Sequence, residues 1–290
     1  MVMRIVDHRQ FAHKRRKFKL PKGLVLAALV AVAGIGVWFF VADAPENNNQ
    51  LPVQASNTPA PQVEAPVTKS GKLKTFTGEQ FKTLARGIRY PNVQEFTEPP
   101  FITGDPVADA RIRILAEARG YKLTSIPVGA IQKINEPRLE GDDLLQPLAA
   151  LSWTDLKAAA KKDSVPLSLL SAYRSPDYQR TLFMSRLLAK GTSIAQIAAG
   201  QGDAAVTATL GITAVPGYSR HHTGYTIDLW CEDGSGSFLA SRCYKWISES
   251  NYQKAKEAGW IPSYPDGAGE QGPEPEPWEY IWVGKEAVTE

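Results

Sequence analysis

Histidine is scarce in this chain, which has only four in 290 residues. His8 and His13 precede an apolar segment, and the other two form the adjacent pair His221 and His222. Any imidazole chemistry in the folded part must therefore take place at this pair. Asp228 follows His221 after a glycine turn and a short β-prone run. This arrangement suits a catalytic zinc, which takes three protein ligands and leaves one position for water; a surface His–Asp hydrogen bond is the alternative.

Cysteine is rarer still, with only Cys231 and Cys243. In an oxidising compartment these two residues could close a small glycine- and serine-rich loop, so we expect a disulfide between them. Free thiols are the first alternative. Cys231 as a zinc ligand is the second, but Asp228, three residues earlier, already fits that role.

The chain also lacks a basic stripe of the kind that binds nucleic acid, although its net charge is +3. More than all of this excess lies before residue 23, in a cluster opposed only by Asp7: Arg4, Arg9, Lys14, Arg15, Arg16, Lys17, Lys19 and Lys22. The part of the chain after residue 43 is therefore neutral to slightly acidic. We expect no nucleic-acid partner.

Residues 23–42 contain no charge and are rich in Leu, Val, Ala and Phe. The run is long enough to cross a bilayer as a helix, and the basic residues before it place the N-terminus in the cytoplasm. A cleaved signal peptide is the alternative, because Ala42-Asp43-Ala44 resembles a cleavage site. However, the run is longer than a secretory apolar region, and Pro45 would directly follow the cut.

We therefore expect a single-pass protein of the plasma (inner) membrane, with its catalytic domain periplasmic or extracellular. Its expected parts are a cytoplasmic basic tail (1–22), a transmembrane helix (23–42), a flexible linker (43–72), an N-terminal region of the ectodomain (73–140) and a core domain (141–290). The linker is rich in Pro, Asn and Gln and has no aromatic residue, so it cannot bury enough apolar surface to fold.

Hydrophobic periodicity in the ectodomain predicts helices and strands in irregular order, which favours an α+β fold over a doubly wound sheet. The expected helices are 77–88, 105–120, 142–162, 178–190 and 244–259. The expected strands are 121–128, 165–173, 225–230 and 278–283.

A second polar constellation surrounds Arg174, which follows the apolar run 165–173 and is flanked by hydroxyl and amide side chains. An arginine in this position can clamp a carboxylate through two parallel hydrogen bonds. Pairing with a structural acid is the alternative.

The third constellation lies near the C-terminus. Glu276 precedes a proline, outside regular structure, where a general base could stand clear of a strand. Strand alternation from Trp278 onward places Glu279 and Ile281 on one face. The alternative is an acidic, solvated tail, against which Trp278 and Trp282 argue.

Together the three constellations resemble the zinc D-alanyl-D-alanine carboxypeptidases of the VanY type, which trim peptidoglycan stem peptides. The pattern typical of that family is Ser-Gly-Tyr-Arg-Ser followed by Gln, then Ser-x-His-x-x-Gly-x-Ala-x-Asp, then Glu-Pro-Trp-His. The matching positions are Ser171, Tyr173, Arg174, Ser175, Gln179, Ser219, His221, Gly224, Asp228, Glu276, Pro277 and Trp278. Three ordered motifs over roughly residues 141–284 make the resemblance specific.

The resemblance implies a small α+β fold with a mixed or antiparallel sheet, shared with the Hedgehog signalling domain. It also implies that His221 and Asp228 bind zinc and that Glu276 is the general base. Arg174 would hold the substrate and stabilise the oxyanion. The residues implied in substrate binding are Ser171, Tyr173, Gln179, Ser219 and Trp278.

The main departure is Glu279, which stands where the family has its third histidine ligand. Ile281 and Thr226 are milder departures. A His/Asp/Glu set keeps three ligands but is more anionic, so zinc would be a weaker Lewis acid and manganese could compete.

We therefore expect a membrane-anchored metallo-carboxypeptidase whose partners are the peptidoglycan stem peptide and, through residues 23–42, the membrane. The alternative is a catalytically inactive peptidoglycan-binding module that lost its metal site. An endopeptidase or L,D-carboxypeptidase on the same scaffold is a third possibility.

Overall fold

The computed structural model describes residues 71–136, 140–265 and 272–290. The expected cytoplasmic tail, the expected transmembrane helix and nearly all of the expected linker lie outside these residues. No helix within the described ranges is long and apolar enough to cross a bilayer.

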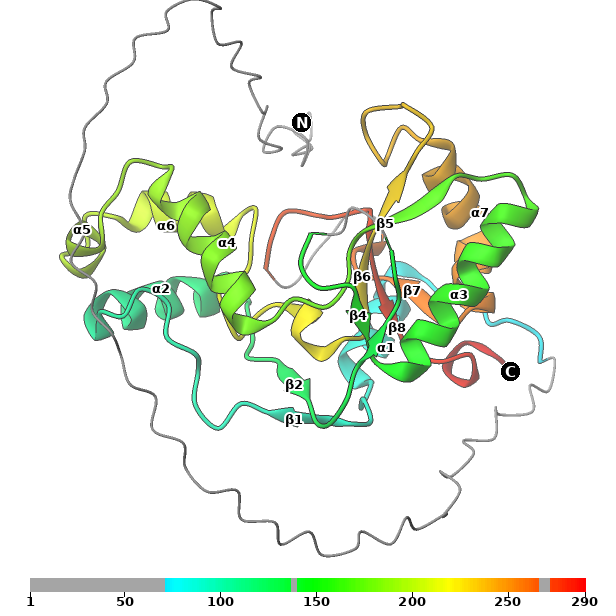
Figure 1. The fold of residues 1–290 in the computed structure, drawn as a ribbon, viewed down its shortest axis with the longest axis horizontal. Helices are drawn as coiled ribbons and strands as arrows, with labels where there is room; N and C mark the ends of the chain where they lie inside the picture. Colours follow the sequence, from blue (N-terminus) through cyan, green and yellow to red (C-terminus); the bar gives the residue numbers. More distant parts are fainter. Residues whose placement is uncertain (1–70, 137–139, 266–271) are drawn as a thin grey trace, which may run out of the picture. The chain divides into compact units, whose positions relative to one another are not determined.

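The described chain is a mixture of helices and short strands (Figure 1). The helices are α1 (Gly78–Gly87), α2 (Pro106–Ala118), α3 (Pro147–Lys162), α4 (Pro176–Leu188), α5 (Ile194–Ala198), α6 (Asp203–Leu210), α7 (Arg242–Glu257) and the short 3₁₀ helices η2 (Arg220–Thr223) and η4 (Glu286–Val288). The strands are β1 (Val93–Glu95), β2 (Ser125–Pro127), β3 (Gln132–Lys133), β4 (Leu144–Leu145), β5 (Leu167–Ser171), β6 (Thr226–Cys231), β7 (Trp260–Pro262) and β8 (Glu279–Trp282).

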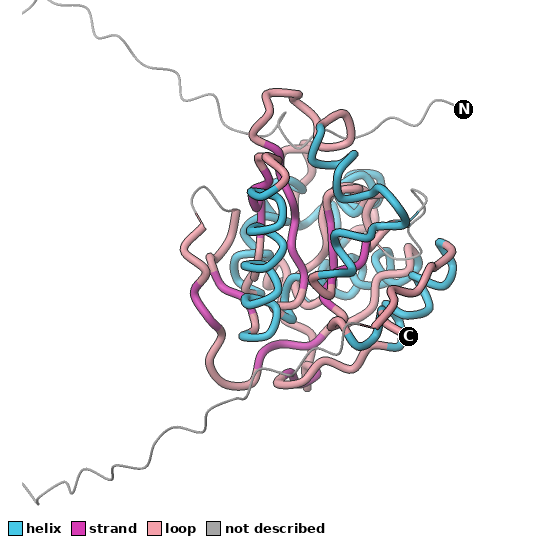
Figure 2. Tube along the Cα trace, turned by 90° about the vertical axis from the view of Figure 1, so that its right-hand side faces the viewer, coloured by secondary structure: helices cyan, strands magenta, loops and turns pink. Residues whose placement is uncertain are grey.

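Four strands form the central sheet in the order β5-β6-β8-β7, and every neighbouring pair is antiparallel. Figure 2 shows these strands running side by side with helices packed against them. Helices α3 and α7 bury the apolar side chains of β5, β6 and β7 in one core, which contains Trp153, Leu229 and Trp260. The remaining strands form two antiparallel pairs, β1 with β2 and β3 with β4. The expected α+β class with a small antiparallel sheet is confirmed.

A second core lies among α2, α4, α5 and α6, at the left in Figure 1. It contains Ile112, Phe183, Ile197 and Leu210. The periodicity analysis did not predict α5 or α6. The signal was present in the sequence, because Ser193 and Gln196 form a capping box at the start of α5.

The structure revises two predicted elements. The helix expected from residue 142 begins at Pro147, because proline fits the first helical turn but has no N–H to continue a helix from earlier residues. The preceding Leu144–Leu145 pair with β3 instead. The strand expected over residues 121–128 is reduced to β2.

The first part of the N-terminal region packs directly on the sheet, whereas α2 belongs to the second core. Phe81 of α1 lies in a third apolar cluster with Ile261 and Ile281. Tyr90 stacks on Tyr225 at a ring-centroid distance of 4.4 Å. Pairs of this kind contribute about 0.5–1.5 kcal/mol beyond the burial of their area. The two regions thus share apolar clusters, and the boundary expected near residue 140 stays a prediction.

Candidate metal centre and active site

Three candidate ligands converge from two neighbouring strands and a short helix. Asp228 on β6 lies directly opposite Glu279 on β8 in the antiparallel register. His221 comes from η2, which ends at Gly224 in the left-handed conformation with φ +75°. A Cβ at this glycine would lie 3.2 Å from Cγ of Gln146. The glycine therefore allows the tight reversal that brings His221 back over β6.

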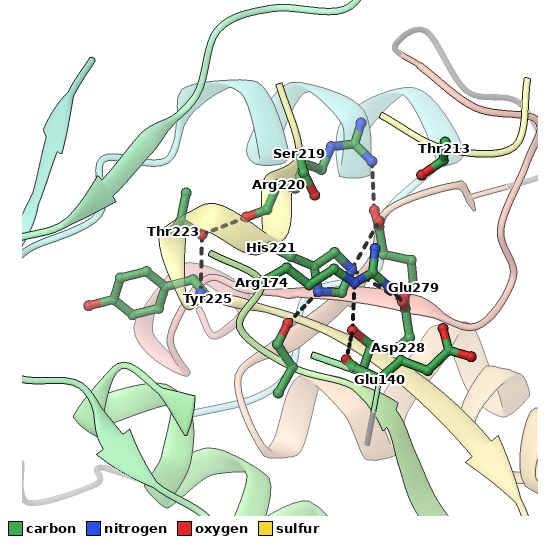
Figure 3. Close-up of polar contacts among 12 residues, drawn as sticks. Glu140, Arg174, Thr213, Ser219, Arg220, His221, Thr223, Tyr225, Asp228 and Glu279 are labelled. Carbon is green, nitrogen blue, oxygen red and sulfur yellow. Dashed lines mark hydrogen bonds and ion pairs between the residues drawn. The ribbon is translucent and has the colours of Figure 1, made fainter. Parts of the chain in front are cut away.

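The distances within this group fit a metal ion. Possible ligand atoms of His221, Asp228 and Glu279 all lie within 4.8 Å of one another, and all three residues are buried. His221 Nε2 is 3.3 Å from Asp228 Oδ2 and 3.7 Å from Glu279 Oε2 (Figure 3). Ligand atoms about 2.1 Å from a tetrahedral zinc stand about 3.4 Å apart. The group is therefore close to the spacing that one ion requires.

The tautomer of His221 also fits metal binding. Its Nδ1 lies 2.6 Å from the carbonyl oxygen of Ala172, and an imidazole can satisfy that oxygen only by donating Nδ1–H. The buried Nε2 has no hydrogen-bond partner in the described part of the chain. A histidine that ligates a metal is commonly fixed in this way by its second nitrogen. Once deprotonated to bind a metal, the side chain would thus direct its Nε2 lone pair toward the space between the two carboxylates.

His222, the only other histidine among the described residues, has both ring nitrogens engaged. Nε2 accepts from the backbone N–H of Gly217 at 3.0 Å, and Nδ1 lies 2.6 Å from the carbonyl oxygen of Arg174. Burial lowers the pKa of His222 to about 4, so the ring is neutral. Its role is to fix the loop around Gly217 and the backbone at Arg174, which leaves Glu279 as the third candidate ligand.

Arg174 lies beside the ligand group and is held on two sides. Its guanidinium forms an ion pair with Asp228, and its Nε donates to Ser171 Oγ at 2.7 Å. Ser171 in turn donates to the carbonyl oxygen of Glu140 at 2.9 Å. Gly141, at φ +94°, allows the close approach, because a Cβ there would lie 2.9 Å from the carbonyl oxygen of Tyr173. The sequence analysis did not identify this glycine.

A second arginine, Arg220, forms an ion pair with Glu279 and was not predicted from the sequence. Nη1 of Arg220 donates to Glu279 Oε1 at 2.8 Å, and its guanidinium lies over the ring of Tyr264 at 5.0 Å. In Figure 3 the Arg220 guanidinium lies above Glu279. His221 Nε2 is near the other carboxylate oxygen of Glu279, Oε2. Arg220 directly precedes His221, and this adjacency was the available sequence signal.

Charge in the group is set by burial and by these ion pairs. Burial and Arg174 oppose protonation of His221, but Asp228 and Glu279 outweigh them and raise the pKa of His221 to about 9 in the metal-free protein. Burial also opposes the charged form of Glu279, yet Arg220 and His221 lower the pKa of its carboxyl. Both candidate ligand carboxylates therefore lie beside positive charge.

Glu276 is positioned by a turn immediately before β8. The backbone N–H of Glu279 donates to the carbonyl oxygen of Glu276 at 3.0 Å, with Pro277 at the turn position that favours proline. Glu276 and Glu279 line the same cleft as Arg174 and His221. This cleft encloses about 410 Å³ of non-protein space, including open solvent. The candidate base, ligand and oxyanion-binding residues therefore meet at one surface depression.

The five expected substrate-binding residues occupy different places. Ser219 lines the cleft, whereas Ser171 supports Arg174. Gln179 is buried and donates to the carbonyl oxygen of Ala214 at 2.7 Å, so it shapes the cleft wall from behind. Trp278 lies in the core beneath the sheet.

The fifth expected residue, Tyr173, lies beside Arg174 at the end of β5. Its backbone N–H donates to the carbonyl oxygen of Leu144, and it bridges to Asp142. This pairing ties the segment before α3 to the strand that carries Arg174. Arg186 of α4, not identified from the sequence, lines the cleft and donates to the carbonyl oxygen of Ile212 at 2.8 Å.

Cys231 and Cys243 form a disulfide, with Cα atoms 5.7 Å apart. It joins the end of β6 to the start of α7. The bond therefore ties the strand that carries Asp228 to one of the helices that cover it.

The fold and the site define an α+β protein with a buried His/Asp/Glu group suited to a metal ion. Residues 142–285 match the family model described as VanY: D-alanyl-D-alanine carboxypeptidase. This match confirms the resemblance predicted from the three motifs.

Two curated relatives each match a little under half of the chain. A D-alanyl-D-alanine carboxypeptidase of Enterococcus faecalis is 34% identical over 139 residues, covering 47% of this chain and 47% of the relative. The putative carboxypeptidase YodJ of Bacillus subtilis is 30% identical over 137 residues, covering 45% of this chain and 43% of the relative. The chain thus spans about half the length of the curated relatives it matches.

Among solved structures, the chain is similar to a variant of the vancomycin-resistance D,D-pentapeptidase VanY from a VanB-type resistance cassette, determined in complex with Zn(II). The sequence identity is 25% and the TM-score is 0.41, covering 56% of this chain and 84% of that chain.

Proposed function

We propose that this chain is a membrane-anchored zinc carboxypeptidase that removes the terminal D-alanine from peptidoglycan stem peptides. The observation that carries the proposal is the convergence of His221, Asp228 and Glu279, with Glu276 and Arg174 on the same cleft. The residues that supply this group lie within the segment that matches the VanY family model.

The donor set favours zinc among the common metals. Zinc accepts imidazole nitrogen and carboxylate oxygen, and three protein ligands leave a fourth position open. When bound, zinc acts as a Lewis acid toward the scissile carbonyl and lowers the pKa of a coordinated water to about 7. Manganese, which oxygen ligands suit better, is the competing expectation.

Each remaining role falls to a residue of the cleft. The Glu276 carboxylate accepts a proton from the attacking water and returns it to the leaving amine. Arg174 directs guanidinium N–H groups at the oxygen on which negative charge develops. Because Arg174 is already anchored by Ser171, little reorganisation is required when the substrate binds.

The test is release of D-alanine from an N-acylated L-Lys-D-Ala-D-Ala peptide by the full-length chain in mild detergent. The proposal predicts D-alanine release that a chelator abolishes and added zinc restores, with no release from the matched peptide ending in L-alanine. Peptide binding without hydrolysis, indifferent to chelator, would instead support a binding module. Cleavage at an internal bond, or cleavage specific for an L,D-bond, would change the substrate class. The metal-dependent mechanism would still hold.

The membrane location is part of the proposal and rests on the uncharged run 23–42 and the basic residues before it. We expect the chain to fractionate with the inner membrane, with residues 73–290 accessible only to protease added outside the cytoplasm. Release of a shorter soluble form would support the cleaved signal peptide.

A further inference from the structure

The two carboxylate oxygens of Glu279 face different partners. Oε1 accepts a hydrogen bond from Arg220 Nη1 at 2.8 Å, while Oε2 lies 3.7 Å from His221 Nε2. Both residues are largely shielded from solvent, with side-chain exposures of 25% for Arg220 and 6% for Glu279. The arginine thus occupies one oxygen and leaves the other directed at the ligand group (Figure 3).

Arg220 is itself fixed in place. It begins η2, immediately before His221, so one helical turn sets both side chains. Its guanidinium lies over the ring of Tyr264, where a cation–π contact restricts its movement. The Tyr264 ring and the Glu279 carboxylate thus hold the guanidinium beside the ligand group.

The charge of the pair matters as much as its geometry. A neutral imidazole as third ligand adds no charge to a metal site, whereas a carboxylate adds one negative charge. Arg220 contributes one positive charge at hydrogen-bond distance from that carboxylate. The Arg220–Glu279 pair is therefore neutral overall, which gives the site the net charge it would have with a neutral histidine at residue 279 and no arginine at residue 220.

We infer that Arg220 is a positioning residue that makes Glu279 a monodentate and charge-compensated third ligand. The inference rests on the proposed function, because it assumes that the group holds a divalent metal. The positive charge of Arg220 offsets the extra negative charge that was expected to make zinc a weaker Lewis acid in a His/Asp/Glu set. It also explains why a glutamate can stand in this position without the site being lost.

The experiment introduces Arg220→Met into two full-length proteins, the unmodified chain and the Glu279→His variant. Zinc affinity is measured by competition with a chromophoric chelator for the unmodified chain, Arg220→Met, Glu279→His and the double variant. The matched control is Arg111→Met, because Arg111 forms a similar ion pair with Asp203 in the helical region, outside the cleft lining. Thermal unfolding of each variant reports any loss of fold.

We expect Arg220→Met to weaken zinc binding about 10- to 100-fold, as loss of an outer-shell partner does. In the Glu279→His background the same change should not weaken zinc binding, because Arg220 then has no carboxylate ligand to orient or to compensate. Arg111→Met should leave the affinity unchanged. If Arg220→Met fails to fold, Arg220→Gln, which keeps an N–H donor for Oε1 but removes the charge, replaces it in the same comparison.

The visible spectrum of the cobalt(II)-substituted protein supplies a readout that a purely structural role would not move. With Arg220 in place, Glu279 offers one oxygen and a four-coordinate site should absorb strongly. Without Arg220, both oxygens can bind and the higher coordination number should weaken the absorption.

Equal losses of zinc affinity in both backgrounds, or no loss in either, would overturn the inference while leaving the carboxypeptidase proposal intact. Failure of the unmodified chain to bind zinc would instead remove the proposed function, and the inference with it.

Discussion

Asp228 lies directly opposite Glu279 across strands β6 and β8. Like charges in such a cross-strand pair are destabilising, and burial increases the cost because water cannot screen them. Here the two residues are only 2% and 5% exposed. Arg174 holds one carboxylate and Arg220 the other. The sheet register thus places two acids where only nearby positive charge, from arginine or from a metal, makes the arrangement stable.

Glu276→Gln separates catalysis from metal binding. The substitution preserves the shape of the side chain but removes the carboxylate that accepts a proton, so we expect kcat to fall about 10²- to 10⁴-fold. Zinc content should be unchanged, because Glu276 lies outside the His221, Asp228 and Glu279 group. The measurement is D-alanine release paired with elemental analysis of the same sample. Hydrolysis at the original rate would remove Glu276 as the base.

Zinc affinity should depend on pH through His221. The raised pKa, about 9, means that the metal-free protein carries a proton on this imidazole at neutral pH. A ligand must lose its proton to bind metal, so affinity should rise about tenfold per pH unit up to that value. Calorimetry in buffers of different ionisation enthalpy should detect one proton released per zinc at pH 7. Affinity independent of pH between 6.5 and 9 would contradict this assignment.

The same proton should affect the stability of the metal-free protein. The folded-state pKa of His221 lies above its ordinary value of 6.5, so the folded protein binds the proton more tightly than the unfolded chain. This stabilisation is fully present below pH 6.5 and is lost as pH rises through 9. Urea unfolding of the metal-free chain should show that decline, and His221→Gln should abolish it.

Removing the disulfide should lower stability without removing the site. Cys231 and Cys243 are 12 residues apart, and closing a loop of this size contributes about 2–3 kcal/mol in the chain-entropy account. The double Cys→Ser variant should therefore unfold at lower urea concentration yet still bind zinc. Quantitative thiol labelling of the denatured, unreduced protein at both positions would contradict the bond.

All three members of the candidate ligand group were predicted from the sequence: His221 and Asp228 from their spacing around a glycine turn, and Glu279 from the resemblance to the family's third motif. The sequence also predicted the major helices and the strand that carries Asp228. These elements have strong periodicity and clear caps, such as the Thr77 capping box of α1 and the Asp105 N-cap of α2.

The features that were not predicted from the sequence depend on tertiary contacts. The Arg220–Glu279 pair joins residues 59 positions apart, and nothing in their local sequence shows that β6 and β8 are neighbours. Gly141 matters only because the segment before α3 passes against Tyr173 and Arg174. Helices α5 and α6 are short, so their periodicity was too weak to predict them.

In the proposed function His221, Asp228 and Glu279 together hold one metal ion. The metal content of the full-length chain, purified without chelator, should be compared with that of Glu279→Ala by elemental mass spectrometry. We expect close to one zinc per chain, with a large loss in the variant. No metal in the unmodified chain, even after zinc is offered, would contradict this expectation, as would equal zinc in both proteins.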